Sequence, residues 1–472
     1  MVLPLALAQF IASYAATNMN VAISDIARDL DTTVAGLQAT ITLFTLTMAS
    51  LMIPGSTLTD IWGRKVCFVG GLAVYGIGAL LALLAPGLGL MIVGYSLLEG
   101  VGSALMIPPI YILITVAFPD VKTRARYFGV VSGAGGLGAA AGPLIGGLVT
   151  SLVSWRASFG LQVLVVGWII VLARRIVDPA PERTGRRFDV LGAVLSAAGL
   201  FFVVLGILQS TRYGWLVART DFSIGGTVVI PAGGISPVWL FVGVGVLILV
   251  LFLLHVRAAE RSGREPLLRL RLFRNRTANL GLGTQTAQWF IMQGTFFVVS
   301  VFLQQERGYS AIRTGLTLIP AIAGILLSSA GAERFANRHP QRRLVIAGFL
   351  AATAGLGLLL ALVRTDSGVL SSVPGLLLLG LGIGVMLTSS VNIVQSSFPD
   401  SDQGDISGLS RSVSNLGSSL GTAVAGSVLV AAGHPGGRPF ALAIVTVAVV
   451  SVIGLVLAVA IPRRPAMSGT PG

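Results

Sequence analysis

Residues 127–150 read YFGVVSGAGGLGAAAGPLIGGLVT, a run that contains no Asp, Glu, Lys or Arg. A helix needs about 20 apolar residues to cross the hydrocarbon core of a bilayer, so this run is long enough to span a membrane. Gly138, Gly142 and Gly146 recur within it at four-residue spacing. Small residues at that spacing let two membrane helices approach closely. The stretch therefore predicts a spanning helix that packs tightly against a neighbour.

The whole chain, like this segment, is rich in apolar residues. Its 472 residues are 54% apolar and 11% charged, and the mean hydropathy is +0.88, whereas soluble domains carry about 25% charged residues. The net charge is +14, but the basic residues fall in short loops between apolar runs, which argues against a nucleic-acid partner. Cys67 is the single cysteine, so an intramolecular disulfide and a cysteine metal site are both excluded.

Thirteen further runs are long enough to cross a bilayer. The sequence therefore predicts an all-α membrane protein with fourteen transmembrane helices. The predicted spans are residues 2–23, 35–57, 67–86, 89–116, 127–150, 155–176, 189–209, 237–257, 277–303, 312–331, 344–363, 371–396, 408–432 and 439–461.

Lysine and arginine fall unevenly on the two sides of these spans. About three times as many lie on the side that holds both termini as on the other, and basic loops stay in the cytoplasm. Arg411, near the start of the 408–432 span, is counted with the cytoplasmic set. Lys65 and Lys122 are the only lysines, and this preference for arginine suggests a bacterial genome rich in G and C. We expect a multi-pass protein of a bacterial plasma (inner) membrane with both termini in the cytoplasm.

Two segments far apart in the chain echo each other. Gly417 and Gly421 in the thirteenth span follow Gly138 and Gly142 in the fifth by the same offset. Two related bundles around a central site are typical of transporters that rock between two open states. The alternative is that glycine-rich helices simply resemble one another. The expected units are a six-helix bundle over 1–176, a two-helix insert with loops over 177–276, and a second six-helix bundle with a short tail over 277–472.

Glu99 is the one acid that the predicted spans place deep in the membrane. It lies about ten residues into the 89–116 span, roughly 15 Å along a helix that rises 1.5 Å per residue. An ionised carboxylate at that depth is costly, so such residues usually face a polar cavity and have a function. We predict that Glu99 couples transport to protons and that a polar or cationic substrate competes for the same carboxylate. The alternative is a permanently protonated side chain that hydrogen-bonds a neighbouring helix.

Amide side chains also stand inside the predicted spans, where they must pair with another helix or line a wet cavity. Three glutamines and Trp289 fall broadly on one face of the ninth span. A cavity of amides, aromatics and one acid suits amphipathic compounds, including cationic ones. The predicted cavity residues are Asn18, Asn20, Gln285, Gln288, Trp289, Gln293, Asn392 and Asn415.

On this topology the chain resembles the fourteen-span drug:proton antiporter branch of the major facilitator superfamily. Residues 56–65, STLTDIWGRK, are similar to the signature that follows helix two in that family. GAAAGPLIGG, from Gly138 to Gly147, is similar to its antiporter motif. Further matches are Trp155-Arg156-x-x-Phe159 at helix six and Asn415-Leu-Gly417-x-x-x-Gly421 in helix thirteen.

The resemblance implies a major facilitator fold and secondary active export of small hydrophobic or amphipathic compounds, as in multidrug efflux and antibiotic resistance. It implies proton antiport without a cofactor, a catalytic residue or a metal. It also implies a cytoplasmic gate, whose charges hold the two halves together in one state, at Asp60, Gly63, Arg64 and Lys65. A seal and hinge for alternating access, or tight packing alone, is implied at Gly138, Gly142, Pro143, Gly146 and Gly147.

Helices one and four depart from the family's pattern. The acid usual in helix one is replaced by Ala15, the arginine usual in helix four by Ser96, and the following glutamine by Glu99. The alternative function is therefore a dedicated exporter of one endogenous metabolite or antibiotic with different coupling. No intramembrane His or Cys cluster and no nucleophile motif supports an enzyme. The expected partners are a small-molecule substrate, protons and the lipid bilayer, and the expected assembly is a monomer.

Overall fold

The computed structural model describes residues 1–118, 121–176, 188–224, 227–264, 266–336, 340–364, 367–398, 403–430 and 437–462. Long helices dominate this part of the chain. The α-helices are α1 (Val2–Asn18), α2 (Ile23–Asp29), α3 (Val34–Trp62), α4 (Arg64–Leu83), α5 (Leu88–Met91), α6 (Gly100–Ala117), α7 (Val121–Leu152), α8 (Trp155–Ala173), α9 (Val190–Tyr213), α10 (Pro237–Arg261), α11 (Arg276–Val301), α12 (Ala311–Ala336), α13 (Gln341–Leu362), α14 (Val373–Gln395), α15 (Gln403–Val430) and α16 (Gly437–Ala460). The other elements are 3-10 turns η1 (Met19–Val21), η3 (Leu270–Arg274) and η5 (Val369–Ser372), π-helical turns η2 (Ile92–Glu99) and η4 (Phe302–Glu306), and strands β1 (Phe222–Ile224) and β2 (Thr227–Ile230).

Each of the fourteen predicted spans coincides with a long helix, which confirms the all-α membrane class. In the described residues, thirteen helices are long and apolar enough to cross a membrane. The fourteenth, α15, has 28 residues but is richer in serine, and it runs beside α3 and α11 inside the bundle. Its serines are tolerated because neighbouring helices, and not lipid, surround it. The antiparallel β1–β2 hairpin is an addition that the sequence did not predict.

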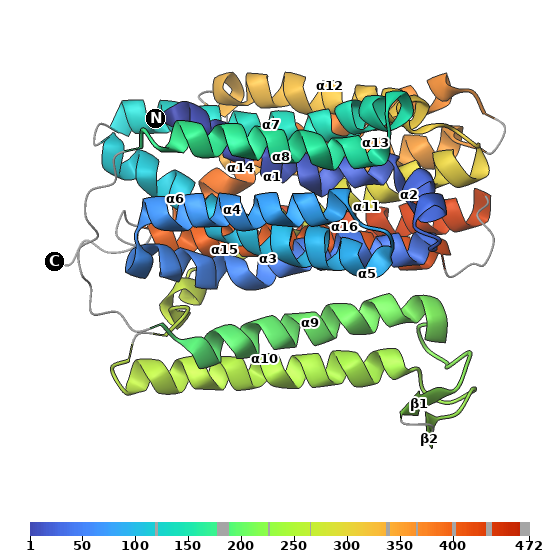
Figure 1. Ribbon diagram of the computed structural model, residues 1–472, viewed down its shortest axis with the longest axis horizontal. Coiled ribbons are helices and arrows are strands. Elements are labelled where there is room, and N and C mark those ends of the chain that lie inside the picture. The colour runs from blue at the N-terminus through green and yellow to red at the C-terminus, as the bar shows by residue number, and fades with distance from the viewer. Residues whose placement is uncertain are drawn as a thin grey trace.

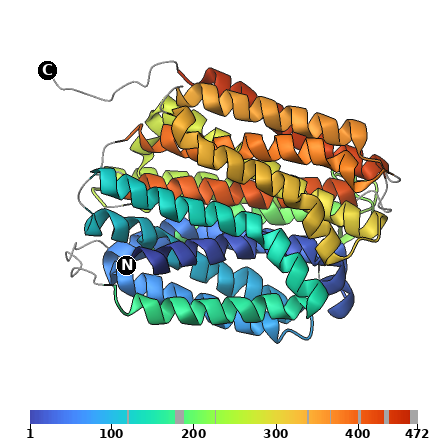
Figure 2. The same cartoon turned by 90° about the horizontal axis from the view of Figure 1, so that it is seen from above.

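The helices form two groups that lie side by side (Figure 2). In the first group α7 packs along α1, and in the second α15 packs along α11. The repeated glycines make both contacts: Gly138 faces the carbonyl of Phe10 on α1, and Gly417 faces the carbonyl of Thr286 on α11. A side chain at either glycine would collide with backbone. The sequence echo thus corresponds to the same close helix pair built twice.

The two groups meet along two helix pairs, α3 with α15 and α7 with α12. We call the end of the molecule where α1 begins the amino end, and the opposite end, which carries α2 and η4, the far end. In Figure 1 the amino end is on the left. These two pairs bound the space between the halves, where the site lies.

Helices α9 and α10 form a pair at one side of the bundle (Figure 1). Helix α9 packs on α3 and α15, whereas α10 packs mainly on α9. Val204 of α9 makes a small buried cluster with Leu46 and Ala423. Much of α10 is exposed, including Leu247, Leu251 and Leu254, as expected for a helix that faces lipid.

Asp189 links the start of α9, helix α10 and the segment at Leu267 through hydrogen bonds at the amino end. Its Oδ1 accepts a hydrogen bond from Gly192 N at the start of α9, 2.9 Å away, and lies 2.9 Å from His255 Nε2 of α10. Its Oδ2 accepts from Leu267 N at 3.2 Å. Burial raises the pKa of Asp189, but these hydrogen bonds outweigh it, so the pKa lies below its ordinary value.

Replacing Asp189 by alanine should lower the midpoint of thermal unfolding. Losing an N-cap costs about 1 kcal/mol, and losing hydrogen bonds to a charged group costs about 1.5–3 kcal/mol more. Asp189→Asn, which can still cap α9, should lower the midpoint of unfolding by less. Because the folded pKa is lowered, the wild-type contribution is present at neutral pH and is lost as the pH falls below about 3.9. Equal melting of wild type and Asp189→Ala at pH 7 would contradict this assignment.

Candidate functional site

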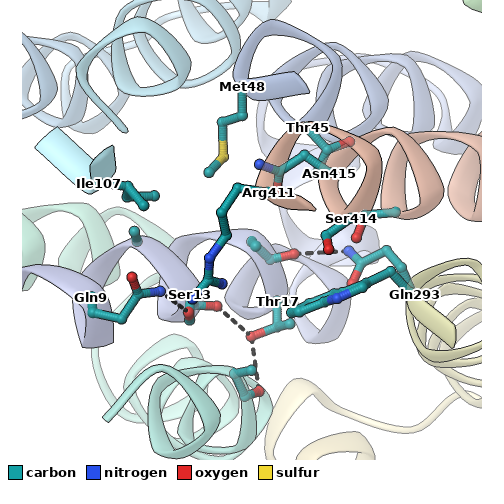
Figure 3. A pocket seen from close by; sticks show the side chains of 15 residues that line it. Gln9, Ser13, Thr17, Thr45, Met48, Ile107, Gln293, Arg411, Ser414 and Asn415 are labelled. Atoms are coloured by element: carbon teal, nitrogen blue, oxygen red, sulfur yellow. Dashed lines mark hydrogen bonds between the residues drawn. The ribbon is translucent and has the colours of Figure 1, made fainter. Parts of the chain in front are cut away.

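A cavity lined by both polar and apolar side chains lies between the two halves (Figure 3). Helices α1, α3, α6 and α7 of the first half and α11 and α15 of the second contribute its walls. Ser13, Thr17 and Ser414 supply hydroxyls, whereas Met48 and Ile107 supply an apolar wall. Hydroxyl, amide and apolar side chains therefore meet at one place between the two halves.

Arg411 lines this cavity, which corrects its assignment to the cytoplasmic side. Helix α15 begins at Gln403, five residues earlier than the predicted span, so Arg411 lies eight residues into the helix and not three. Its side chain reaches into the cavity (Figure 3). A guanidinium nitrogen donates to Tyr111 Oη on α6, and the guanidinium carbon lies 5.3 Å from the centre of the Tyr111 ring. Sequence reasoning missed this residue because a basic side chain near a span's end usually marks the membrane surface.

Three of the eight predicted cavity residues line this cavity: Trp289, Gln293 and Asn415. Gln293 Nε2 donates to Ala16 O at 2.8 Å, so it also bridges α11 to α1 across the two halves. Trp289 and Gln293 are one helical turn apart and point the same way.

The other five predicted residues lie elsewhere. Gln285 accepts from Ser410 Oγ at 2.7 Å inside the second half. Gln288 faces α14, where its amide, turned about its last bond, pairs with Met386 O at 3.3 Å and Leu387 N at 3.2 Å. The reason is that α11 is enclosed on nearly every side, with 89% of its span buried, so its amides meet helices in several directions. Asn18 and Asn20 are buried toward the far end, and Asn392 is exposed on α14.

Hydrogen bonds between the halves close the cavity toward the far end. Gln304 of η4 donates to Asn20 O at 2.9 Å and accepts from Ser24 N at 2.9 Å. Ile312 N of α12 donates to Ser151 Oγ of α7 at 2.9 Å. We call this set of contacts the far-end seal. Sequence reasoning placed Asn20 in a cavity and did not single out Gln304.

Gln38 strengthens the contact between the halves on α3. Its Nε2 donates to Thr422 O at 3.2 Å, Ala423 O at 3.0 Å and Ser427 Oγ at 3.1 Å, all on α15. The sequence feature that could have identified Gln38 is that it is an amide within an apolar span.

The glycines of the antiporter-like motif divide between two neighbours. Gly138, Gly142 and Gly146 face α1 of the same half, where they approach Phe10, Thr17 and Asn18. Gly147 faces α12 of the other half, where a Cβ would lie 2.6 Å from Ala311 O. The carbonyl of Pro143 likewise meets Gly315 of α12. The motif therefore both builds the first half and forms part of the far-end seal.

The gate-like motif lies at the amino end, between α3 and α4. The backbone of Asp60 is in α3, and its side chain lies outside the described residues. Gly63 joins the two helices with φ 95°, a conformation that favours glycine. Arg64 begins α4, and Lys65 Nζ donates to Ile176 O at 2.6 Å. This Lys65 contact joins two parts of the first half.

Glu99 is fully buried inside the first half and does not line the central cavity. It ends the π-helical turn η2, where Gly78 of α4 packs against its backbone nitrogen. Tyr75 lies within reach of its carboxyl group, but the Tyr75 hydroxyl donates its single proton to Gln162 Oε1 of α8. Neither carboxyl oxygen accepts a hydrogen bond from a described residue, and Gln162 Nε2 has no partner either.

A turn of the Gln162 amide by 180° would connect these groups. Gln162 Nε2 would then donate to Tyr75 Oη, and the Tyr75 hydroxyl could donate to Glu99. The oxygen and nitrogen of an amide are assigned from the hydrogen-bond network, so both orientations are physically accessible. In the structure, Tyr75 joins Gln162 of α8 to the surroundings of Glu99 inside the first half.

Comparison with known proteins gives a consistent set of relatives. The family model described as Major Facilitator Superfamily matches residues 5–422. The chain is 27% identical to the multidrug resistance protein Stp of Mycobacterium tuberculosis, over 88% of this chain and 72% of that protein. It is 30% identical to the tetracenomycin C resistance and export protein of Streptomyces glaucescens (86% and 71%) and 29% identical to the cephamycin export protein CmcT of Amycolatopsis lactamdurans (88% and 82%).

Proposed function

Because the chain belongs to the Major Facilitator Superfamily, we propose that it is a secondary active exporter of small hydrophobic or amphipathic compounds. The observation that carries the proposal is the cavity of mixed polarity between the two halves. A site in that position can face each side of a membrane in turn when the halves rock. The relatives' names, which describe drug resistance and export, give the direction. Transport of this kind leaves the substrate chemically unchanged, so we assign no enzyme activity.

We assign the amino end to the cytoplasm of a bacterial cell. Arg64 and Lys65 begin α4 at this end, and Arg174 and Arg175 follow α8 there. Basic residues at the ends of spans favour the cytoplasmic side. With this orientation, the far-end seal closes the cavity to the outside, and substrate reaches it from the cytoplasm or the inner leaflet.

Protons are the proposed coupling ion, and Glu99 is the proposed carrier. It is fully buried with no described hydrogen-bond donor to its carboxyl group. An ionised carboxylate in such a place is strongly disfavoured, so this conformation suits the protonated form. Release of the proton then requires a rearrangement that brings water or a donor such as Tyr75 to the carboxylate.

In this proposal, substrate and proton do not compete for the Glu99 carboxylate. They are coupled through helix α1. One face of α1 lines the cavity with Ala12 and Ala16. The same helix contacts η2, the turn that ends at Glu99, because Tyr95 Oη donates to Ala15 O at 2.9 Å. Substrate and proton would therefore both act on helix α1, and each could shift its position. A linkage of this kind needs only that both ligands prefer different states of α1.

Efflux from proteoliposomes under an imposed pH gradient tests the function. A panel of fluorescent amphiphiles of different shape should be moved against its gradient by the wild-type protein and not by empty vesicles. Transport of many compounds supports a multidrug exporter, and transport of one supports a dedicated exporter. Absence of gradient-driven transport for the whole panel would count against proton-coupled export of such compounds.

A further inference from the structure

The central cavity carries one charged group among its described lining residues, and that group is Arg411. Glu99 is buried inside the first half and is not among the residues that line the cavity. The ion pairs of the described chain join Arg28 with Asp25, Arg156 with Asp29, and His255 with Asp189. None of them involves Arg411. The cavity is therefore positively charged, contrary to the expectation that its charge would be one acid.

The contacts of Arg411 leave part of its guanidinium available. An arginine has five N–H donors in a planar fork and a fixed positive charge. One nitrogen donates to Tyr111 Oη, and the guanidinium stacks near the Tyr111 ring at 5.3 Å. Its side chain crosses the cavity toward Ser13 and Gln9 on α1 (Figure 3). Tyr111 thus holds the side chain in place while other donors face the space where a substrate would sit.

We propose that this cavity binds amphipathic organic anions and that Arg411 holds their carboxylate, phenolate or similar negative group. The inference rests on the proposed export function and specifies its substrate class. A guanidinium pairs with a carboxylate through two parallel hydrogen bonds, which gives both affinity and orientation. A cationic compound in the same cavity would meet uncompensated like charge.

The remaining walls fit the rest of such a molecule. Trp289 offers an aromatic face, and Met48 and Ile107 offer aliphatic surface. Asn415 and Ser414 stand within one turn of Arg411 on α15 and can accept or donate hydrogen bonds beside the anionic group. An aromatic ring bearing a carboxylate uses both kinds of wall at once.

The alternative is that Arg411 has a structural role alone and serves only to link α15 to Tyr111 of α6. The two roles predict different results for charged and neutral ligands. Losing a structural link would weaken every ligand by a similar factor, whereas losing an anion site would weaken anions alone.

Equilibrium dialysis of three matched probes against the purified full-length protein tests the proposal. The probes are 2-naphthoate, its methyl ester, and 2-naphthyltrimethylammonium, which share one aromatic body and differ in charge. Wild type should bind naphthoate about ten- to a hundredfold more tightly than the ester, the range for a hydrogen bond to a charged group. The ammonium probe should bind most weakly.

Variants assign that preference to one side chain. Arg411→Gln should weaken naphthoate about ten- to a hundredfold and change the ester little, whereas Arg411→Lys should retain the preference for the anion. Arg313→Gln is the matched control, because Arg313 is exposed on α12 and stacks 3.9 Å from the Tyr309 ring outside the cavity. It should bind all three probes as wild type does.

The proposal is overturned if wild type binds the ammonium probe as tightly as naphthoate, a result that stands even if Arg411→Gln does not fold. It is also overturned if folded Arg411→Gln keeps the preference for the anion. Transport of the same probes in proteoliposomes separates this inference from the export function. If the protein transports the ester and shows no preference for the anion, the export function stands and the anion site is wrong. If naphthoate binds in an Arg411-dependent way but no probe is transported, the anion site stands and the export function is wrong.

Discussion

Replacing Glu99 by glutamine should abolish transport driven by a pH gradient and leave substrate binding in place. Glutamine has nearly the same shape, so the packing against Gly78 and Tyr75 is kept. It cannot release a proton, so the cycle would stay in the conformation that suits the neutral side chain. Uphill transport should fall to the level of passive leak. The cavity, which Glu99 does not line, should still bind substrate.

Proton release gives the sharpest measurement of this effect. Adding substrate to purified wild-type protein in weakly buffered solution should release protons, detected with a pH-sensitive dye, and Glu99→Gln should release none. Glu306→Gln is the matched control, since it makes the same chemical change at the far end. Gradient-driven transport that survives in Glu99→Gln would place the coupling proton on another residue.

Adding one methyl group at Gly315 should force the far-end seal open. A Cβ there would collide with the carbonyl of Pro143 in the other half, and backbone cannot move aside as a flexible side chain can. Overpacking of this kind costs about 1–3 kcal/mol, which shifts a two-state equilibrium by about five- to a hundredfold. Gly147→Ala, which would meet Ala311 O, should act in the same direction. Gly136→Ala on the same helix α7 is the control, because nothing lies within 4 Å of its Cβ position.

Cysteine labelling from outside measures this opening. Cys67 is the native cysteine and is buried, so a variant lacking it can carry one reporter at Ala16, whose side chain lines the cavity. A membrane-impermeant maleimide should label Ala16→Cys slowly in the parent and about five- to a hundredfold faster with Gly315→Ala. An unchanged labelling rate in the folded Gly315→Ala protein would mean that the α7–α12 contact does not control access.

The fold was predictable because membrane insertion is a local property of sequence. Each span needs only a long enough apolar run, and its direction follows from nearby basic loops. Boundaries agree within a few residues for most helices; α8, for example, covers Trp155–Ala173 against the predicted 155–176. The close α1–α7 contact was also predictable in kind, because small residues at four-residue spacing let two membrane helices approach closely.

The site was less predictable because it depends on which way each side chain points. Glu99 was identified by its depth, but its side chain is buried inside the first half and does not line the cavity. Gln285, Gln288 and Gln293 are all amides within one apolar span. Only Gln293 of these three lines the cavity. On a helix that is enclosed on all sides, polarity alone does not identify the neighbour that satisfies it.

The sequence by itself determined the membrane class, the fourteen spans and the depth of Glu99. Tertiary structure alone decided that Arg411 lies in the central cavity and that Glu99 is buried away from it. The physical reason is that hydropathy records how deep a residue sits in the membrane but not its direction around the helix axis. That direction is set by contacts between helices that are hundreds of residues apart in the chain, such as Arg411 with Tyr111.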